Sequence, residues 1–202
     1  TMVAPDYLET FRQASLWFGF FQGCVWISEA LSGNLSPTYR KLKTSSEQAY
    51  CACSIVSTLH AIIISFAACD CGWRDGFFSS NDLTFTSTCS SNCLTIFLGY
   101  VLSDLCWLLY YHKEWPGTLP MILHHVLALT TYSDLHAQQL GHNITLVVVL
   151  FEATTPFVNC RWFLSQMDWK DSKLYVVNGL LMTVGWLIIR VVVGGYVGVW
   201  MW

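Results

Sequence analysis

The chain has 202 residues, of which 54% are hydrophobic, 15% are aromatic and only 11% are charged. Soluble domains carry about 25% charged residues, so this composition excludes an ordinary soluble globular protein and predicts a multipass membrane protein. The formal net charge of −3 is too small to indicate a nucleic acid as partner.

Six apolar segments follow one another along the chain. Each is about 20 residues long, which is the length that a helix needs to cross about 30 Å of hydrocarbon. The segments cover residues 14–32, 48–69, 93–111, 118–135, 143–166 and 174–193. They predict an all-α transmembrane helical bundle with six spans. We divide it into an N-terminal segment with the first span (residues 1–34) and a membrane domain (residues 35–202).

The segments that connect these spans differ in charge. With the N-terminus on the non-cytoplasmic side, seven basic residues lie at the cytoplasmic face, namely Arg40, Lys41, Lys43, Lys113, Arg161, Lys170 and Lys173. Only Arg12, Arg74 and Arg190 then lie near the other face. The positive-inside rule favours this orientation. Residues 1–13 lack an apolar core followed by a cleavage site, so we expect no signal peptide there.

The fourth segment carries two adjacent histidines, His124 and His125, in the run TLPMILHHVLALTTYSDL. Ionisable groups inside a span are rare and mark functional sites. Candidate partners are Asp104 in the third segment, Glu152 in the fifth and His60 in the second. At a rise of about 1.5 Å per residue, Asp104 and the histidines lie at matching depth. We therefore expect Asp104 to contact the histidine pair.

The fifth segment contains Pro156, which is expected to kink the helix beside Glu152. Asn159 shares the face of Glu152 by its i, i+7 spacing. Arg161 and Asn178 fall in the same cytoplasmic third of the bundle, although Arg161 also suits a side chain that extends to the membrane surface. The candidate substrate-binding residues are therefore His60, Asn159, Arg161 and Asn178.

Structural interpretations of the same groups stay open. The two histidines suit core positions bonded to the backbone or to Thr130 and Thr131, and buried carboxylates can join neighbouring helices. A metal site of His60, His124, His125 and a carboxylate has suitable ligand types. No spacing typical of a metal site supports it, so we expect no metal.

Four cysteines bracket the long segment between the second and third spans, namely Cys69, Cys71, Cys89 and Cys93. This segment is predicted to be non-cytoplasmic, and oxidising compartments allow disulfides. We expect Cys69 or Cys71 to pair with Cys89 or Cys93. Zinc binding is the alternative, although CxC followed by CxxxC is not a usual zinc-finger spacing.

Several runs of the sequence resemble the TLC-domain family, which includes ceramide synthases and translocating-chain-associated proteins. They are SIVSTLHAIII, FLGYVLSDL, LPMILHHVLAL, FEATTPFVNCRWFL and VVNGLLMTVGWLIIR. The resemblance spans residues 35–190, and the chain is most similar to small TLC domain-containing proteins. It implies six or seven helices around a lipid-sized cavity in the endoplasmic reticulum or another internal membrane.

In ceramide synthases the double histidine belongs to the acyl-transfer site, and His124 and His125 match that pair. The chain departs from the ceramide synthase pattern at Phe151, Glu152 and Thr155, where only one acidic residue is kept. The basic extension and the last span of those enzymes are not found, so we expect a seventh family span to be missing here.

The resemblance and the residues together predict three functions. The first is acyl transfer to a lipid amine or hydroxyl, with His124 or His125 as general base or acyl acceptor and Asp104 or Glu152 orienting the imidazole. The acyl donor would be acyl-CoA or a phospholipid, with no other cofactor. The second is lipid binding without turnover. The third is a structural role as accessory subunit of a larger membrane protein assembly.

Overall fold

The computed structural model describes residues 6–77 and 82–200. The elements are α1 (Tyr7–Leu35), α2 (Pro37–Arg40), α3 (Ser45–Arg74), α4 (Thr88–Tyr110), α5 (Thr118–Ala137), α6 (His142–Val149), η2 (Leu150–Thr154), α7 (Thr155–Gln166), α8 (Lys173–Trp186), η3 (Leu187–Val193) and α9 (Gly194–Trp200). No strand occurs among the described residues. The fold is therefore all-α, as the apolar segments predict.

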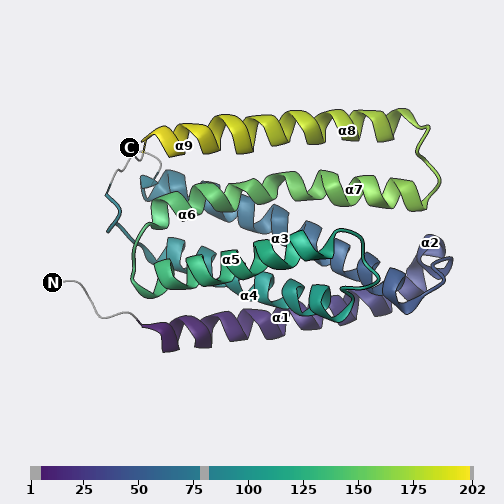
Figure 1. Ribbon diagram of the computed structural model, residues 1–202, viewed down its shortest axis with the longest axis horizontal. Coiled ribbons are helices and arrows are strands. Elements are labelled where there is room, and N and C mark those ends of the chain that lie inside the picture. The colour runs from purple at the N-terminus through teal and green to yellow at the C-terminus, as the bar shows by residue number, and fades with distance from the viewer. Residues whose placement is uncertain (1–5, 78–81, 201–202) are drawn as a thin grey trace.

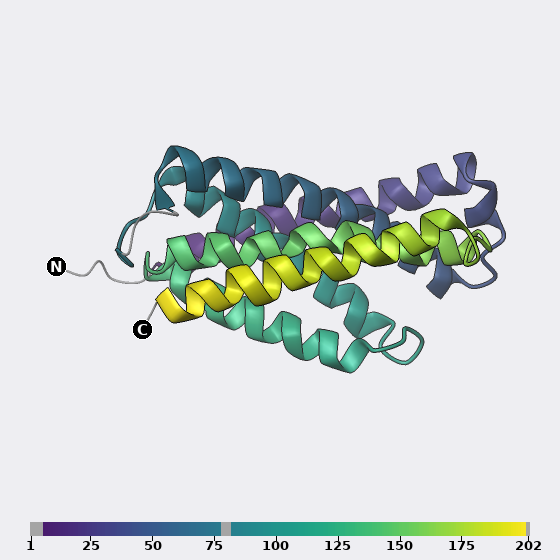
Figure 2. The ribbon, with the colours of Figure 1, turned by 90° about the horizontal axis from the view of Figure 1, so that it is seen from above.

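The long helices lie side by side along one axis and form an elongated bundle (Figure 1). α2 and the connection from α7 to α8 lie at one end, whereas α3 ends and α4 begins at the other. The basic segments that the positive-inside rule assigns to the cytoplasm therefore share one end. α8, η3 and α9 form an outer layer along α6 and α7 (Figures 1 and 2).

Each predicted span lies in a helix or a run of helices. Within the described part of the chain, four stretches are long and apolar enough to cross a membrane, namely Ser45–Arg74, Thr88–Tyr110, His142–Gln166 and Lys173–Tyr196. α1 and α5, with 29 and 20 residues, are not among these four stretches. The protein is thus an integral membrane helical protein, and the crossing of α1 and α5 stays a prediction.

The last two predicted spans are interrupted. α6 passes into the 3₁₀ turn η2, which contains Glu152, and α7 then begins with Pro156 in its first turn. Proline is accepted there because the first helical residues need no intrahelical N–H bond. η3 is a π-helical turn that carries Arg190. Such turns are frequent at functional sites.

α1 and α4 approach each other closely at Gly99. A Cβ at this position would lie 2.8 Å from the carbonyl oxygen of Ala14 and 2.9 Å from the backbone nitrogen of Phe18. Small residues allow such approaches between membrane helices. Gly99 therefore holds α1 against the side of α4.

His136 and His142 join four helices at the end where α5 passes into α6. Thr10 of α1 lies 2.8 Å from Nδ1 of His136, and Ser90 of α4 lies 2.8 Å from Nδ1 of His142. The two imidazoles are buried and nearly parallel, with ring centroids 5.9 Å apart. This histidine pair therefore ties α5 to α1 and α6 to α4.

Candidate functional site

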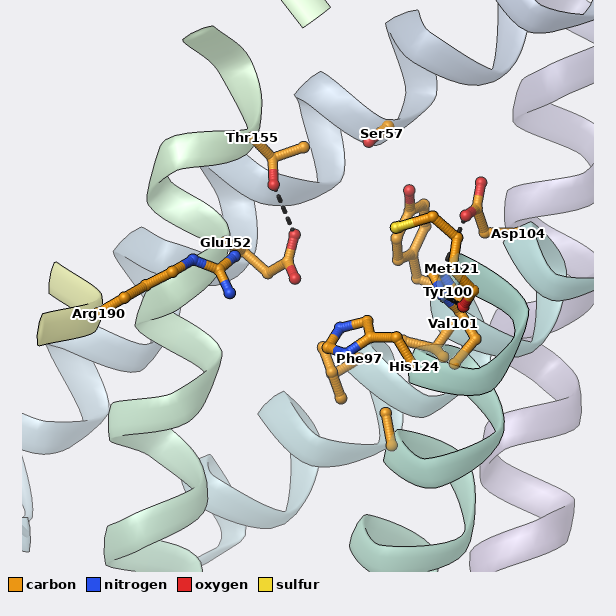
Figure 3. Close-up of a pocket in the computed structure, with 12 residues that line it drawn as sticks. Ser57, Phe97, Tyr100, Val101, Asp104, Met121, His124, Glu152, Thr155 and Arg190 are labelled. Carbon is orange, nitrogen blue, oxygen red and sulfur yellow. Dashed lines mark hydrogen bonds and ion pairs between the residues drawn. The ribbon is translucent and has the colours of Figure 1, made fainter. Parts of the chain in front are cut away.

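Two adjoining cavities lie in the middle of the bundle. Their volumes are about 260 and 360 Å³, close to the range of about 300–1,000 Å³ that is usual for small-molecule sites. Both are lined by Ser57, Asp104, Met121, Thr155 and Arg190. Tyr100, His124, His125 and Glu152 complete the polar lining of the first cavity, which Figure 3 shows in close-up. The histidine pair and both candidate carboxylates thus meet in one place.

His125 forms an ion pair with Asp104. Its Nε2 lies 2.9 Å from Asp104 Oδ2, and both side chains are largely buried. Its Nδ1 lies 2.9 Å from the carbonyl oxygen of Met121. A carbonyl oxygen only accepts hydrogen bonds, so Nδ1 carries a proton. The other nitrogen shares a proton with the carboxyl group, and His125 therefore has no free lone pair with which to act as a base.

His124 differs from its neighbour. It is exposed and lines the first cavity. Its ring is nearly perpendicular to that of His125, with centroids 5.7 Å apart. Neither of its nitrogens has a hydrogen-bond partner among the residues that the structure describes. Figure 3 shows the imidazole projecting from α5 into the space before Glu152. His124 is therefore the histidine with nitrogens available to a ligand.

Glu152 and Arg190 form the opposite wall of the cavity. The Thr155 hydroxyl donates to Glu152 Oε2 at 2.9 Å. Arg190 donates to the Phe151 carbonyl oxygen at 3.4 Å, and its guanidinium lies 5.4 Å from the centroid of the Phe151 ring. Its Nε is buried without a partner in the described residues. The site thus combines a cation, a carboxylate and an open imidazole (Figure 3).

Arg190 was not among the predicted site residues. The positive-inside rule put it near the non-cytoplasmic face and gave it no role, whereas in the structure it lines both cavities. The π-helical turn of η3 carries it there. The available signal was a lone basic residue within an otherwise apolar predicted span, which marks a functional position in the same way as His124 does.

Two predicted residues lie close to the cavities in structural roles. His60 is 1% exposed and stacks on Tyr100 at a centroid distance of 3.7 Å. Tyr100 lines the first cavity, so His60 lies behind its wall. Asn159 lines the second cavity, but its amide donates to the Ser54 carbonyl oxygen and the Thr58 hydroxyl, each at 3.0 Å. Asn159 therefore joins α7 to α3.

Arg161 and Asn178 are not brought to either cavity. The Arg161 guanidinium lies 4.1 Å from the centroid of the Tyr175 ring. The Asn178 amide donates to the Phe157 carbonyl oxygen at 2.9 Å. Both residues therefore hold α7 against α8.

The cysteines lie at the end where α3 and α4 meet. A disulfide joins Cys71 and Cys89, whose Cα atoms are 5.7 Å apart. Cys69 is an exposed free thiol and Cys93 is a buried free thiol. Within residues 6–77 and 82–200, no group of three or more His, Cys, Asp or Glu side chains is arranged to hold a metal ion.

Comparison with known proteins matches the TLC domain to residues 47–202. The chain is 28% identical over 82% of its length to TLC domain-containing protein 4 A of Dictyostelium discoideum, and spans 64% of that protein. It is 30% identical over 87% of its length to TLC domain-containing protein 4-B of Xenopus laevis, and spans 65% of it. The human TLC domain-containing protein 4 is 28% identical over 82% of the chain. No solved structure matches the chain significantly.

Proposed function

Because the chain belongs to the TLC-domain family, we propose that it binds a lipid acyl chain in its central cavities and transfers an acyl group to a lipid amine or hydroxyl. One observation carries this proposal. His124 presents an unbonded imidazole to a cavity that also holds an ion pair, a carboxylate and an arginine. A general base needs this combination of access and polar surroundings.

In the proposed reaction His124 accepts the proton of the lipid amine or hydroxyl while that group attacks the acyl carbonyl carbon. Arg190 stabilises the negative charge that develops on the carbonyl oxygen. The bond to the leaving group then breaks, and His124 returns the proton to the coenzyme A thiolate or the lysophospholipid. The His125–Asp104 pair keeps α4 and α5 in register, so it positions His124 rather than reacting itself.

A second candidate function is lipid binding without turnover. It is favoured by an apolar cavity of about 370 Å³ between α3, η2 and η3, lined by residues such as Ile62, Phe66, Leu150 and Val193. This surface has the character of an acyl-chain groove.

We place either function in an internal membrane, with the endoplasmic reticulum as the expected one and the N-terminus on the non-cytoplasmic side.

The test is transfer of a labelled acyl group by the purified protein in phospholipid vesicles. Labelled acyl-CoA and labelled phosphatidylcholine serve as alternative donors, with a sphingoid base, a lysophospholipid and diacylglycerol as acceptors. We expect His124→Ala to lower the rate at least about 100-fold. The matched control is His112→Ala, because His112 is an exposed histidine outside both cavities.

Equal rates for the two variants would contradict the role of His124. A second outcome is that the wild type transfers no acyl group with any donor and acceptor and yet keeps lipid bound through purification. That result would contradict catalysis and support the lipid-binding function. Mass spectrometry of the intact protein–lipid complex distinguishes these results.

A further inference from the structure

Three cysteine sulfur atoms lie together at the end of the bundle where α3 meets α4. Cys71 is bonded to Cys89, and Sγ of Cys93 lies 3.5 Å from Sγ of Cys71. Cys89 and Cys93 are four residues apart on α4, so they lie on the same helix face. Cys71 thus has two alternative partners on one face of the neighbouring helix.

The two alternative partners have different surroundings. Cys71 and Cys93 are buried, with 0% and 3% of their surfaces exposed, whereas Cys89 is only half-buried. Arg74 Nη2 lies 3.3 Å from Sγ of Cys89, and the same guanidinium is held by Asp70 at 3.0 Å. A guanidinium beside a sulfur atom stabilises its thiolate form. Cys89 is therefore the better leaving group of the disulfide, and it can be reached from outside.

We propose that Cys71, Cys89 and Cys93 form a thiol–disulfide exchange site. The Cys93 thiolate attacks Sγ of Cys71, a new Cys71–Cys93 bond forms, and Cys89 leaves with the electron pair of the old bond as a thiolate beside Arg74. The proton of Cys93 passes to solvent. No net oxidation occurs. The two sulfur atoms approach from 3.5 Å to about 2.05 Å.

The exchanged form presents a reactive cysteine to the surroundings. The Cys89 thiolate can attack an outside disulfide, forming a mixed disulfide at Cys89 and releasing the second half of that molecule as a thiolate. The substrate class is therefore a disulfide, either a small one or one carried by another protein. This activity is independent of the acyl chemistry, because the sulfur cluster lines none of the central cavities.

The first experiment maps disulfides by peptide mass spectrometry of the purified full chain. We expect Cys89→Ser to contain a Cys71–Cys93 disulfide and Cys93→Ser to retain Cys71–Cys89. Two free thiols at Cys71 and Cys93 in the Cys89→Ser variant would overturn the proposal.

The second experiment uses oxidised glutathione as the outside disulfide and does not depend on the folding of Cys89→Ser. In the wild type we expect glutathione to attach to Cys89, while in Cys93→Ser the rate at Cys89 falls at least about 10-fold because the Cys71–Cys89 bond is not exchanged. The exposed thiol of Cys69 is the internal control and should react equally in both proteins. Equal labelling of Cys89 in the two proteins would overturn the proposal.

Discussion

His136 and His142 close one end of the bundle, whereas His124 and His125 line its central cavity. The end pair is bonded at Nδ1 to Thr10 and Ser90. Those hydroxyls already donate to the backbone carbonyls of Asp6 and Ser87, so they accept from the imidazoles.

The hydroxyl partners of the end pair therefore suit neutral histidines. The cavity pair has a carboxylate at His125 and no hydrogen-bond partner at His124 among the described residues. The hydrogen-bond partners of the imidazoles, rather than the residue type, thus distinguish a structural histidine pair from one with a nitrogen free to react.

The largest expected effect comes from breaking the ion pair of the cavity. We expect Asp104→Ala to lower the free energy of unfolding by about 3 kcal/mol, because it leaves a buried imidazole without its charged partner. Thermal unfolding in detergent micelles measures this change. Asp171→Ala is the control, since this aspartate is exposed and outside the helices. A loss in Asp104→Ala no greater than the control would show that the pair adds no stability.

The next effect tests the two histidine pairs against each other. We expect His142→Ala to cost about 2 kcal/mol, because it removes a fully buried ring together with its hydrogen bond to Ser90. His124→Ala should cost less than about 1 kcal/mol, since His124 is exposed and makes no hydrogen bond in the described structure. The two unfolding curves, recorded under the same conditions, give the comparison. The opposite order of stabilities would refute the assignment of the end pair as structural.

The smallest effect is a dependence on pH at the bundle end. Burial lowers the pKa of His136 below its usual range, and the charge of Glu9 partly opposes this. The free histidine titrates near about 6.5, so the stability from neutral His136 is complete above that pH. It is lost as the pH falls below it, because the unfolded chain then binds more protons.

The unfolding temperature of the wild type should therefore drop between about pH 7 and pH 5. His136→Gln keeps a polar side chain without a titrating group, so its curve should be flatter. A parallel pH dependence of the two proteins would assign the effect to other groups, of which His142 is the nearest.

The contact between Asp104 and His125 follows from the sequence, because an unpaired ionisable side chain within a span is costly and these two lie at equal depth in adjacent spans. Which histidine stays free does not follow from it. That depends on how α5 is rotated against α4, which brings His125 rather than His124 to Asp104. Arg190 was not predicted as a site residue because it lies in a π-helical turn, which changes the direction of the side chains it contains.

The roles of His136 and His142 were not predicted at all. Their partners Thr10 and Ser90 lie 126 and 52 residues away in the chain. No local pattern of residues reports contacts over such separations.

The close approach at Gly99 shows that the region matched by the family is smaller than the part of the chain that packs together. The matched TLC domain begins at residue 47, after α1 has ended at Leu35. Yet Gly99 lies directly against the backbone of α1, and Thr10 of α1 is bonded to His136. A fragment trimmed to the matched region would expose a glycine groove to lipid chains, which cannot replace those polar contacts. The smallest piece of this chain suited to expression and reconstitution therefore includes α1, even though the matched domain begins at residue 47.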